Sequence, residues 1–229
     1  MRWLSVGLSV VKYFLQKTVW FLGVLGVAAS LSGYAQACST PALTGAHNAM
    51  VPAKSTDSAL VDSAVLHYVN QVRCSKGLSA LTSASGLVDV AEVHSKWMAK
   101  SQQLNHKSRV SGMTTFKKRL KASGVGSRAG SENIGVTHRY QLETAGVFLT
   151  RDLSACRFEA KGRTIPAHSY KSLANHIVNM WMALSGHRKN ILARRSKLTR
   201  ASLAFDGKSP NCGRYFFTQN FAGESACHF

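Results

Sequence analysis

Acidic residues are scarce in this sequence. Ten Asp and Glu stand against 29 Lys and Arg in 229 residues, so the formal net charge is +19. Phosphate contacts supply most of the non-specific affinity of nucleic-acid-binding proteins, so this charge could indicate that class. The basic residues are dispersed, however, with clusters only at 117–121 and 194–200, and no aromatic ladder for base stacking is interleaved with them. We therefore expect no nucleic-acid partner and interpret the charge as a solvated surface suited to an anionic envelope or an acidic exterior, with specific anion binding as the alternative.

A hydrophobic run long enough to cross a membrane is also missing. Residues 1–37 contain three basic and no acidic residues, an apolar run over 19–29, and a small-x-small ending at 35–37. The run is shorter than the ~18 residues of a spanning helix, so the segment has the features of a cleaved export signal. The mature protein would begin at Cys38, carry a net charge of +16, and be secreted or periplasmic. An uncleaved membrane anchor and a lipoprotein acylated at Cys38 remain as alternatives.

Cysteine occurs five times, an odd number for a protein in an oxidising compartment. If Cys38 is acylated or otherwise engaged, the remaining Cys74, Cys156, Cys212 and Cys227 are expected to form two disulfide bonds. Four cysteines allow three pairings, and the sequence does not select among them.

Periodic apolar residues begin only after residue 57. The stretch 38–57 has no apolar period and is expected to be a tether to one domain over 58–229. Within that domain, three- and four-residue spacing predicts helices, and two-residue alternation predicts a C-terminal β-hairpin. The expected helices cover about 61–77, 87–103, 116–124 and 173–184, and the hairpin strands lie near 201–205 and 215–219. Helices followed by a hairpin indicate an α+β fold.

Histidines supply most of the candidate site residues. His94 and His176 fall on apolar helical stripes, so we expect them to pack in the core. His106 and His187 follow predicted helices in polar stretches, where sites are more often built. Glu132, one of the few acids, lies between these two in the sequence. No local metal-binding or catalytic spacing connects the three residues, so spacing alone does not define a site.

Short segments in a fixed order carry a family resemblance. They are VNQVRCSKGLSAL, AEVHSKWM, LNH, SENIG, VNMWMALSGHRKNIL and YFFTQNF, along about 59–223. This order resembles the CAP superfamily of cysteine-rich secretory proteins, antigen 5 and pathogenesis-related proteins, in its bacterial secreted form. The resemblance implies a three-layer α-β-α sandwich whose cleft gathers His106, Glu132 and His187, with Asn133 holding the turn at Glu132. It also makes 138–168 an insertion relative to compact members.

This chain departs from the family pattern at Leu184, where animal and plant members carry a second cleft glutamate. The resemblance therefore implies a cleft set reduced to His106, Glu132 and His187. Two imidazoles, with Glu132 as a further candidate ligand, could hold zinc and leave a coordination position open. The field of a net charge of +16 disfavours a bound dication, so we expect weak metal binding and no required cofactor.

The expected function is that of an exported binding or envelope-associated module whose partner is an anionic envelope component, a lipid or a protein. The alternative is a metal-assisted hydrolase or peptidase, in which His106 and His187 hold the ion and Glu132 activates water. No Ser or Cys nucleophile lies beside a base in a readable motif, and the second family acid is missing, which weakens that alternative. Lipid or sterol binding is a third function that the resemblance implies.

Overall fold

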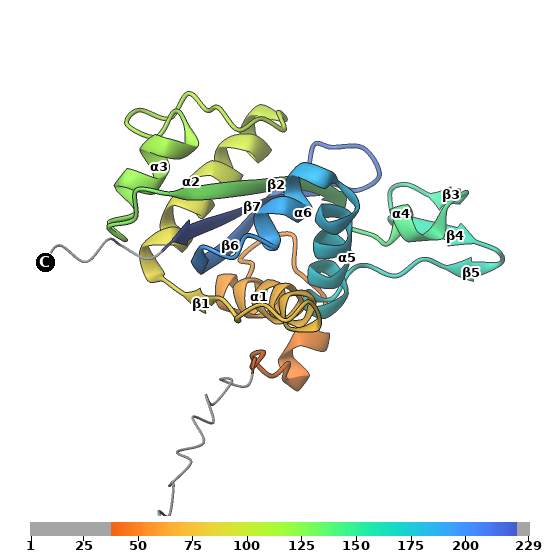
Figure 1. Ribbon diagram of the computed structural model, residues 1–229. Coiled ribbons are helices and arrows are strands. Elements are labelled where there is room, and N and C mark those ends of the chain that lie inside the picture. Colours follow the sequence, from red (N-terminus) through yellow and green to blue (C-terminus); the bar gives the residue numbers. More distant parts are fainter. Residues whose placement is uncertain (1–37, 224–229) are drawn as a thin grey trace, which may run out of the picture. The chain divides into compact units, whose positions relative to one another are not determined.

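The computed structural model describes residues 38–223 (Figure 1). The expected export signal at 1–37 and Cys227 lie outside these residues. Within the described part, none of the helices combines the length and the apolar character needed to cross a membrane.

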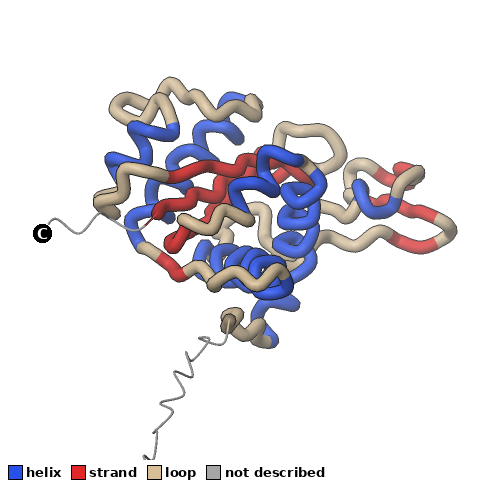
Figure 2. Tube along the Cα trace, in the orientation of Figure 1, coloured by secondary structure: helices blue, strands red, loops and turns tan. Residues whose placement is uncertain are grey.

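A four-stranded sheet forms the middle layer of the domain. Its strands are ordered β1-β6-β7-β2, with β1 parallel to β6 and the other pairs antiparallel. Helices lie on both faces of this sheet (Figure 2). The sheet strands are β1 (Thr82–Ser83), β2 (Gly130–His138), β6 (Ser196–Asp206) and β7 (Arg214–Gly223). The C-terminal hairpin is therefore confirmed as β6 and β7, although both strands extend beyond the residues predicted from alternation.

The helices form the two outer layers. One layer contains α2 and α3, and the other contains α1 and α5 with the short α6 beside β2 (Figure 1). The bounds are α1 (Ser58–Ser75), α2 (Ser85–Ser101), α3 (Phe116–Ala122), α5 (Tyr170–Ala183) and α6 (Ser185–Ile191). Because side chains of a strand alternate between faces, Phe217 packs with α1 and α5 while its neighbour Phe216 packs with Met98 of α2. The α+β sandwich expected from the sequence is confirmed.

Helix α5 lies close against the edge strand β2. Trp181 is buried, and its Nε1 donates a hydrogen bond to the carbonyl of Ile134 at 2.9 Å. A Cβ atom at Gly135 would lie 2.6 Å from Ile177 Cδ1, so glycine allows this approach. The prediction that Trp181 belongs to the core is confirmed, and the contact fixes the strand that carries Glu132.

The segment 38–57, which we expected to be a tether, is packed onto the domain instead. It contains a short 3-10 helix, η1 (Gly45–Asn48), in which His47 is buried, and Val51 is fully buried against the main core. The carbonyl of Val51 accepts a hydrogen bond from the hydroxyl of Tyr215 at 2.9 Å. A single turn is too short to show an apolar period, so this packing could not be predicted from periodicity.

Two disulfide bonds join Cys38 to Cys74 and Cys156 to Cys212, with Cα atoms 5.5 and 5.9 Å apart. The expected set of four bridging cysteines was therefore wrong at one position, because Cys38 takes the place we gave to Cys227. The bond also bears on the lipoprotein alternative. A sulfur bonded to Cys74 cannot carry a lipid thioether, so this structure is not that of a protein acylated at Cys38.

The poorly patterned stretch 138–168 forms a second small unit, seen at the right of Figure 1. We call residues 142–164 the arm; it contains α4 (Leu142–Ala145) and a three-stranded sheet of β3 (Leu149–Asp152), β4 (Arg157–Ala160) and β5 (Arg163–Thr164). Phe158 is the centre of its own small core, and the Cys156–Cys212 bond attaches the arm to the loop between β6 and β7. That the arm is an insertion relative to other members stays a prediction.

Candidate functional site

The segment SENIG lies in strand β2 and not in the turn that we expected. Glu132 pairs with Asn220 of β7, and Asn133 pairs with Gln219. Because neighbouring side chains of a strand point to opposite faces, Glu132 lies on the side of α2 and α3, and Asn133 lies on the side of α6. The two residues therefore act on different layers, although they are adjacent in the sequence.

Glu132 is buried at 5% exposure, and its carboxylate is held by hydrogen bonds from two residues. Arg119 of α3 grips both carboxylate oxygens: its Nε donates to Oε2 at 3.0 Å, and its Nη2 donates to Oε1 at 2.7 Å. His106 Nδ1 lies 2.8 Å from the same Oε1. Charge-assisted bonds of this forked type are among the strongest in proteins, so the carboxylate is fixed in one orientation.

Arg119 was not among the residues we selected from the sequence. Its side chain is fully buried, and besides Glu132 it reaches the carbonyls of His106 at 2.8 Å and Met113 at 3.0 Å. It therefore fixes the loop between α2 and α3 that carries His106. The available signal was its position on the apolar stripe of Phe116 and Leu120, where a basic residue needs a buried acidic partner.

His106 connects this buried pair to solvent. Its side chain is 51% exposed, in contrast to the fully buried guanidinium beside it. Because a carboxylate accepts hydrogen bonds, Nδ1 of the ring donates to Glu132, and Nε2 of the neutral ring keeps its lone pair. A carboxylate that orients a histidine in this way is the usual partner behind a metal-binding imidazole. The geometry therefore favours Glu132 as a residue that positions His106, not as a ligand itself.

His187 lies at the third position of the short helix α6, which follows α5 directly. Asn133 Nδ2 donates to the His187 carbonyl at 3.3 Å, and Asn190 Nδ2 donates to Asn133 Oδ1 at 2.9 Å, so α6 is attached to β2. Burial lowers the pKa of His187, and a coulombic interaction with His106 lowers it further. Among the described residues no hydrogen bond or ion pair joins His187 to His106 or Glu132.

His94 forms the floor beneath Glu132. It is fully buried, stacks on Trp97 at 5.7 Å between ring centroids, and places Nε2 3.9 Å from Glu132 Oε1. Burial lowers its pKa to about 4, partly offset by the nearby Glu132 carboxylate. The expected core position agrees with its burial, and within residues 38–223 neither ring nitrogen has a hydrogen-bond partner.

His176 is only half-buried and pairs with a histidine that we did not single out. Its ring centroid lies 5.4 Å from that of His168, which is buried at 2% exposure. Burial lowers the pKa of both rings, that of His168 to about 4, and the neighbouring His176 lowers it further. The pair belongs to the junction between the arm and the domain.

Leu184, the position of the missing second glutamate, lies between α5 and α6 and is 54% exposed. Its apolar side chain provides no ligand for an ion. The chain therefore has no carboxylate at this position to complete the family set.

Within residues 38–223, His106, Glu132 and His187 do not form the ligand set of a tight metal site. No group of three or more His, Cys, Asp or Glu side chains in residues 38–223 is arranged to hold an ion. Both oxygens of Glu132 are engaged by Arg119, which leaves His106 and His187 as the available ligands. Catalytic zinc sites usually have three protein ligands, and a buried guanidinium nearby adds an unfavourable charge for a dication.

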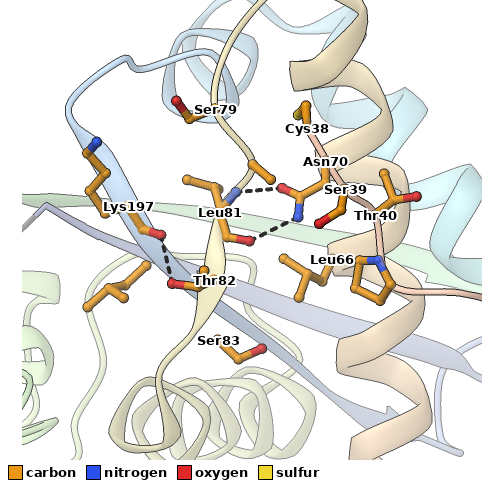
Figure 3. Close-up of a pocket in the computed structure, with 13 residues that line it drawn as sticks. Cys38, Ser39, Thr40, Leu66, Asn70, Ser79, Leu81, Thr82, Ser83 and Lys197 are labelled. Carbon is orange, nitrogen blue, oxygen red and sulfur yellow. Dashed lines mark hydrogen bonds between the residues drawn. The ribbon is translucent and has the colours of Figure 1, made fainter. Parts of the chain in front are cut away.

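A separate hollow lies between the segment after Cys38 and the edge strand β1 (Figure 3). Its volume is about 720 Å³. On its inner side Asn70 Nδ2 donates to the carbonyl of Leu81 at 2.9 Å, and Asn70 Oδ1 accepts from the amide of Leu81 at 2.8 Å. The lining consists of hydroxyl and aliphatic side chains with Lys197, and it contains no histidine or carboxylate. It offers no acid–base or metal chemistry.

Comparisons with known proteins place the chain in a family. Residues 66–221 match the model of the CAP family, the cysteine-rich secretory protein family. No curated protein matches. Two solved structures are similar: an extracellular protein containing an SCP domain from Bacillus anthracis, at 21% identity and a TM-score of 0.47, and an outer surface protein from Borrelia burgdorferi, at 13% identity and a TM-score of 0.45.

The matches cover 73% of this chain and 41% of the Bacillus chain, and 69% of this chain and 87% of the Borrelia chain. This chain thus spans less than half the length of the Bacillus protein. The family match, in contrast, extends over most of the domain and includes the segments that carry His106, Glu132 and His187. The chain belongs to the CAP family of cysteine-rich secretory proteins.

Proposed function

We propose that this protein is an exported binding or envelope-associated module, with a ligand site formed by His106 and His187 and braced by Glu132. The observation that carries the proposal is the buried Arg119–Glu132 pair. Its forked hydrogen bonds occupy both oxygens of the one carboxylate in the site. What remains accessible is a surface of two imidazoles that can accept or donate hydrogen bonds to a ligand.

The same pair disfavours the hydrolase alternative. A general base must reach a water molecule and accept its proton. Glu132 is buried, and each of its oxygens already accepts a charge-assisted hydrogen bond from Arg119. Activating water would require this pair to open and leave a buried guanidinium without its partner, which is costly. We therefore assign Glu132 a positioning role in place of a catalytic one.

The two histidines are suited to bind a divalent metal such as zinc weakly. Their neutral rings are the form that binds metals, and burial together with His106 lowers the pKa of His187, so that ring stays neutral at neutral pH. The proposed location is secreted or periplasmic, which is supported by the composition of residues 1–37 and by the disulfide at Cys38.

Zinc titration of the mature chain tests the proposal. We expect about one equivalent to bind weakly at neutral pH and to be released as the pH falls below the histidine range near ~6.5. His106→Ala and His187→Ala should each remove most of this binding, whereas His67→Ala, a change on α1 outside the cleft, should not. Zinc binding that survives both cleft substitutions would show that the two rings do not share a ligand.

Assays for peptidase and esterase activity with zinc present separate the two functions. We expect no turnover above background. Turnover that disappears in Glu132→Gln, while zinc binding and the melting temperature are kept, would establish the hydrolase and refute the binding module.

A further inference from the structure

Helix α3 carries an unusual concentration of positive charge. Its sequence is FKKRLKA, with four basic and no acidic residues. Arg119 points inward, and its positive charge pairs with the carboxylate of Glu132. Lys117 and Lys121 are four residues apart, so they share the other face of the helix, and both are exposed. One short helix therefore presents a buried cation to the cleft and a pair of cations to solvent.

A hollow of about 470 Å³ lies at this outer face. It is lined by Lys117, Leu120, Lys121 and the loop 126–128, which contributes Arg128 as a third cation. The loop conformation is held by Ser127, whose hydroxyl donates to the carbonyl of Ala129 at 2.7 Å. No acidic residue takes part in the lining.

The floor of this hollow is apolar. Leu120 is buried and packs with Leu87 of α2 and Ala222 of β7 in a small core cluster. Lysine and arginine also lay their aliphatic stems along apolar surface while their charges stay in water. The hollow thus combines an apolar floor with a rim of three positive charges.

The charges of Lys117 and Lys121 do not stabilise the helix. Like charges four residues apart destabilise a helix by about 0.2–0.5 kcal/mol, and a cation in the first turn opposes the helix dipole. Within residues 38–223, Lys117, Lys121 and Arg128 form no ion pair or side-chain hydrogen bond. Elsewhere the chain does pair surface charges, for example Lys96 with Glu92. A bound anion would supply the missing partner.

We infer that Lys117, Lys121 and Arg128 form an anion site that takes a phosphate group, with the adjoining part of the ligand lying on Leu120. Two ammonium groups and a guanidinium suit an oxyanion with several acceptor oxygens. The phosphate can belong to a small phosphomonoester or to a lipid headgroup, since both present the same group. The site lies on the opposite face of α3 from the cleft and does not rest on the function proposed there.

The test compares two triple variants of the mature protein that lose the same charge. One is Lys117→Gln/Lys121→Gln/Arg128→Gln. The matched control is Lys54→Gln/Lys76→Gln/Lys171→Gln, at three exposed positions outside the hollow. Calorimetry with glycerol 3-phosphate and with inorganic phosphate measures the free group, and sedimentation with vesicles of phosphatidylglycerol and phosphatidylcholine measures the headgroup.

We expect the hollow variant to lose about tenfold or more in affinity, and the control to stay close to the wild type, with the binding weakened by salt. Binding of the free phosphate compounds alone identifies a small-molecule ligand, and binding of the vesicles as well identifies a headgroup. Equal loss in both variants would reduce the effect to net charge and overturn the site, as would failure of the wild type to bind any of these probes.

Zinc titration of the hollow variant separates this inference from the proposed function. We expect its zinc binding and melting temperature to match those of the wild type, because the three side chains are exposed and do not contact His106 or His187. If the wild type binds zinc but none of the phosphate probes, only the phosphate site is refuted. If it binds the phosphate probes but not zinc, only the proposed function is refuted.

Discussion

Within residues 38–223, glutamate and histidine meet in two places, and the charges of the two carboxylates are compensated differently. In the cleft, Glu132 is buried and bound to the permanent charge of Arg119. At the base of the arm, Glu143 is partly exposed, and its Oε1 accepts hydrogen bonds from the backbone amide and ring Nδ1 of His138, both at 2.8 Å. Burial raises the pKa of Glu143, but the bonds from His138 outweigh it and lower the pKa overall.

The difference separates a buried pair from one that solvent reaches. A guanidinium keeps its charge at every physiological pH, so the pair of Arg119 and Glu132 is a permanent part of the fold. The side chain of Glu143 is 29% exposed, so water also solvates its carboxylate. The same residue types therefore give a rigid buried support in one region and a solvated surface contact in the other.

The largest effect should come from breaking the cleft pair. Arg119→Ala leaves Glu132 buried without a counter-charge, and we expect the free energy of unfolding to fall by about 3–5 kcal/mol in urea titrations. Arg151→Ala is the control, because it removes a half-exposed pair with Glu159 and should cost less than about 1 kcal/mol. Similar small losses for both would mean that Glu132 does not depend on Arg119.

Acid should act on both regions through two buried histidines. His94 near the cleft and His168 near the arm have pKa values lowered to about 4, in both cases mainly by burial. Unfolded histidine takes up its proton below about pH 6.5, whereas these folded rings resist until about pH 4, so stability is lost as the pH falls through this window. The free energy of unfolding should fall by about 3 kcal/mol for each histidine, because a shift of one pKa unit corresponds to roughly 1.4 kcal/mol.

Denaturant titrations between pH 7 and pH 4.5 measure this slope. His94→Gln and His168→Gln should each flatten it, and the double variant should flatten it most. A wild-type stability that does not change over this range would contradict the buried, neutral state of both rings.

The disulfides should distinguish the arm from the rest of the domain. Cys156→Ser/Cys212→Ser removes the bond that attaches the arm to the β6–β7 loop, and we expect a loss of ~2 kcal/mol, the low end for native bridges. Hydrogen exchange should increase in arm peptides while β2 remains protected. Uniform loss of protection through the cleft would show instead that the arm is part of the cooperative domain.

The smallest change in stability is expected at Leu184. Because this side chain is exposed, Leu184→Glu should alter the free energy of unfolding by less than about 0.5 kcal/mol. The added carboxylate lies three residues before His187, so its charge should raise zinc affinity severalfold. Leu149→Glu on the arm makes the same change of charge at another exposed leucine and should leave zinc affinity unchanged. Equal gains in both variants would assign the effect to net charge.

The periodic parts of the fold could be predicted from the sequence. The apolar stripes of α1, α2 and α5 and the alternation of the final hairpin depend on local spacing, and all these elements are present. Residues 38–57 and the arm could not be predicted in this way. These two segments are held in place by contacts between residues that are distant in the sequence, such as Val51 with Tyr215 and Cys156 with Cys212.

The candidate site shows the same division. His106, Glu132 and His187 were selected through the family resemblance, and the structure places the first two in direct contact. Arg119 was missed although it lies on the apolar stripe of Phe116 and Leu120, because four basic residues crowd one short helix and its partner Glu132 lies on a distant strand. We expected a turn at Glu132, and the structure has a strand there. The strand was missed because a polar edge strand shows little apolar alternation.

The Cys38–Cys74 bond suggests an order for the maturation of the protein. Both cysteines precede α2, and only 36 residues separate them, whereas Cys156 must wait for the loop after β6, 56 residues further on. Because a chain is synthesised from its N-terminus, the first pair of cysteines is available before the second. Under oxidising conditions that bond can therefore close around α1 before the sheet is complete, and the bond of the arm closes afterwards, when the loop between β6 and β7 has been synthesised.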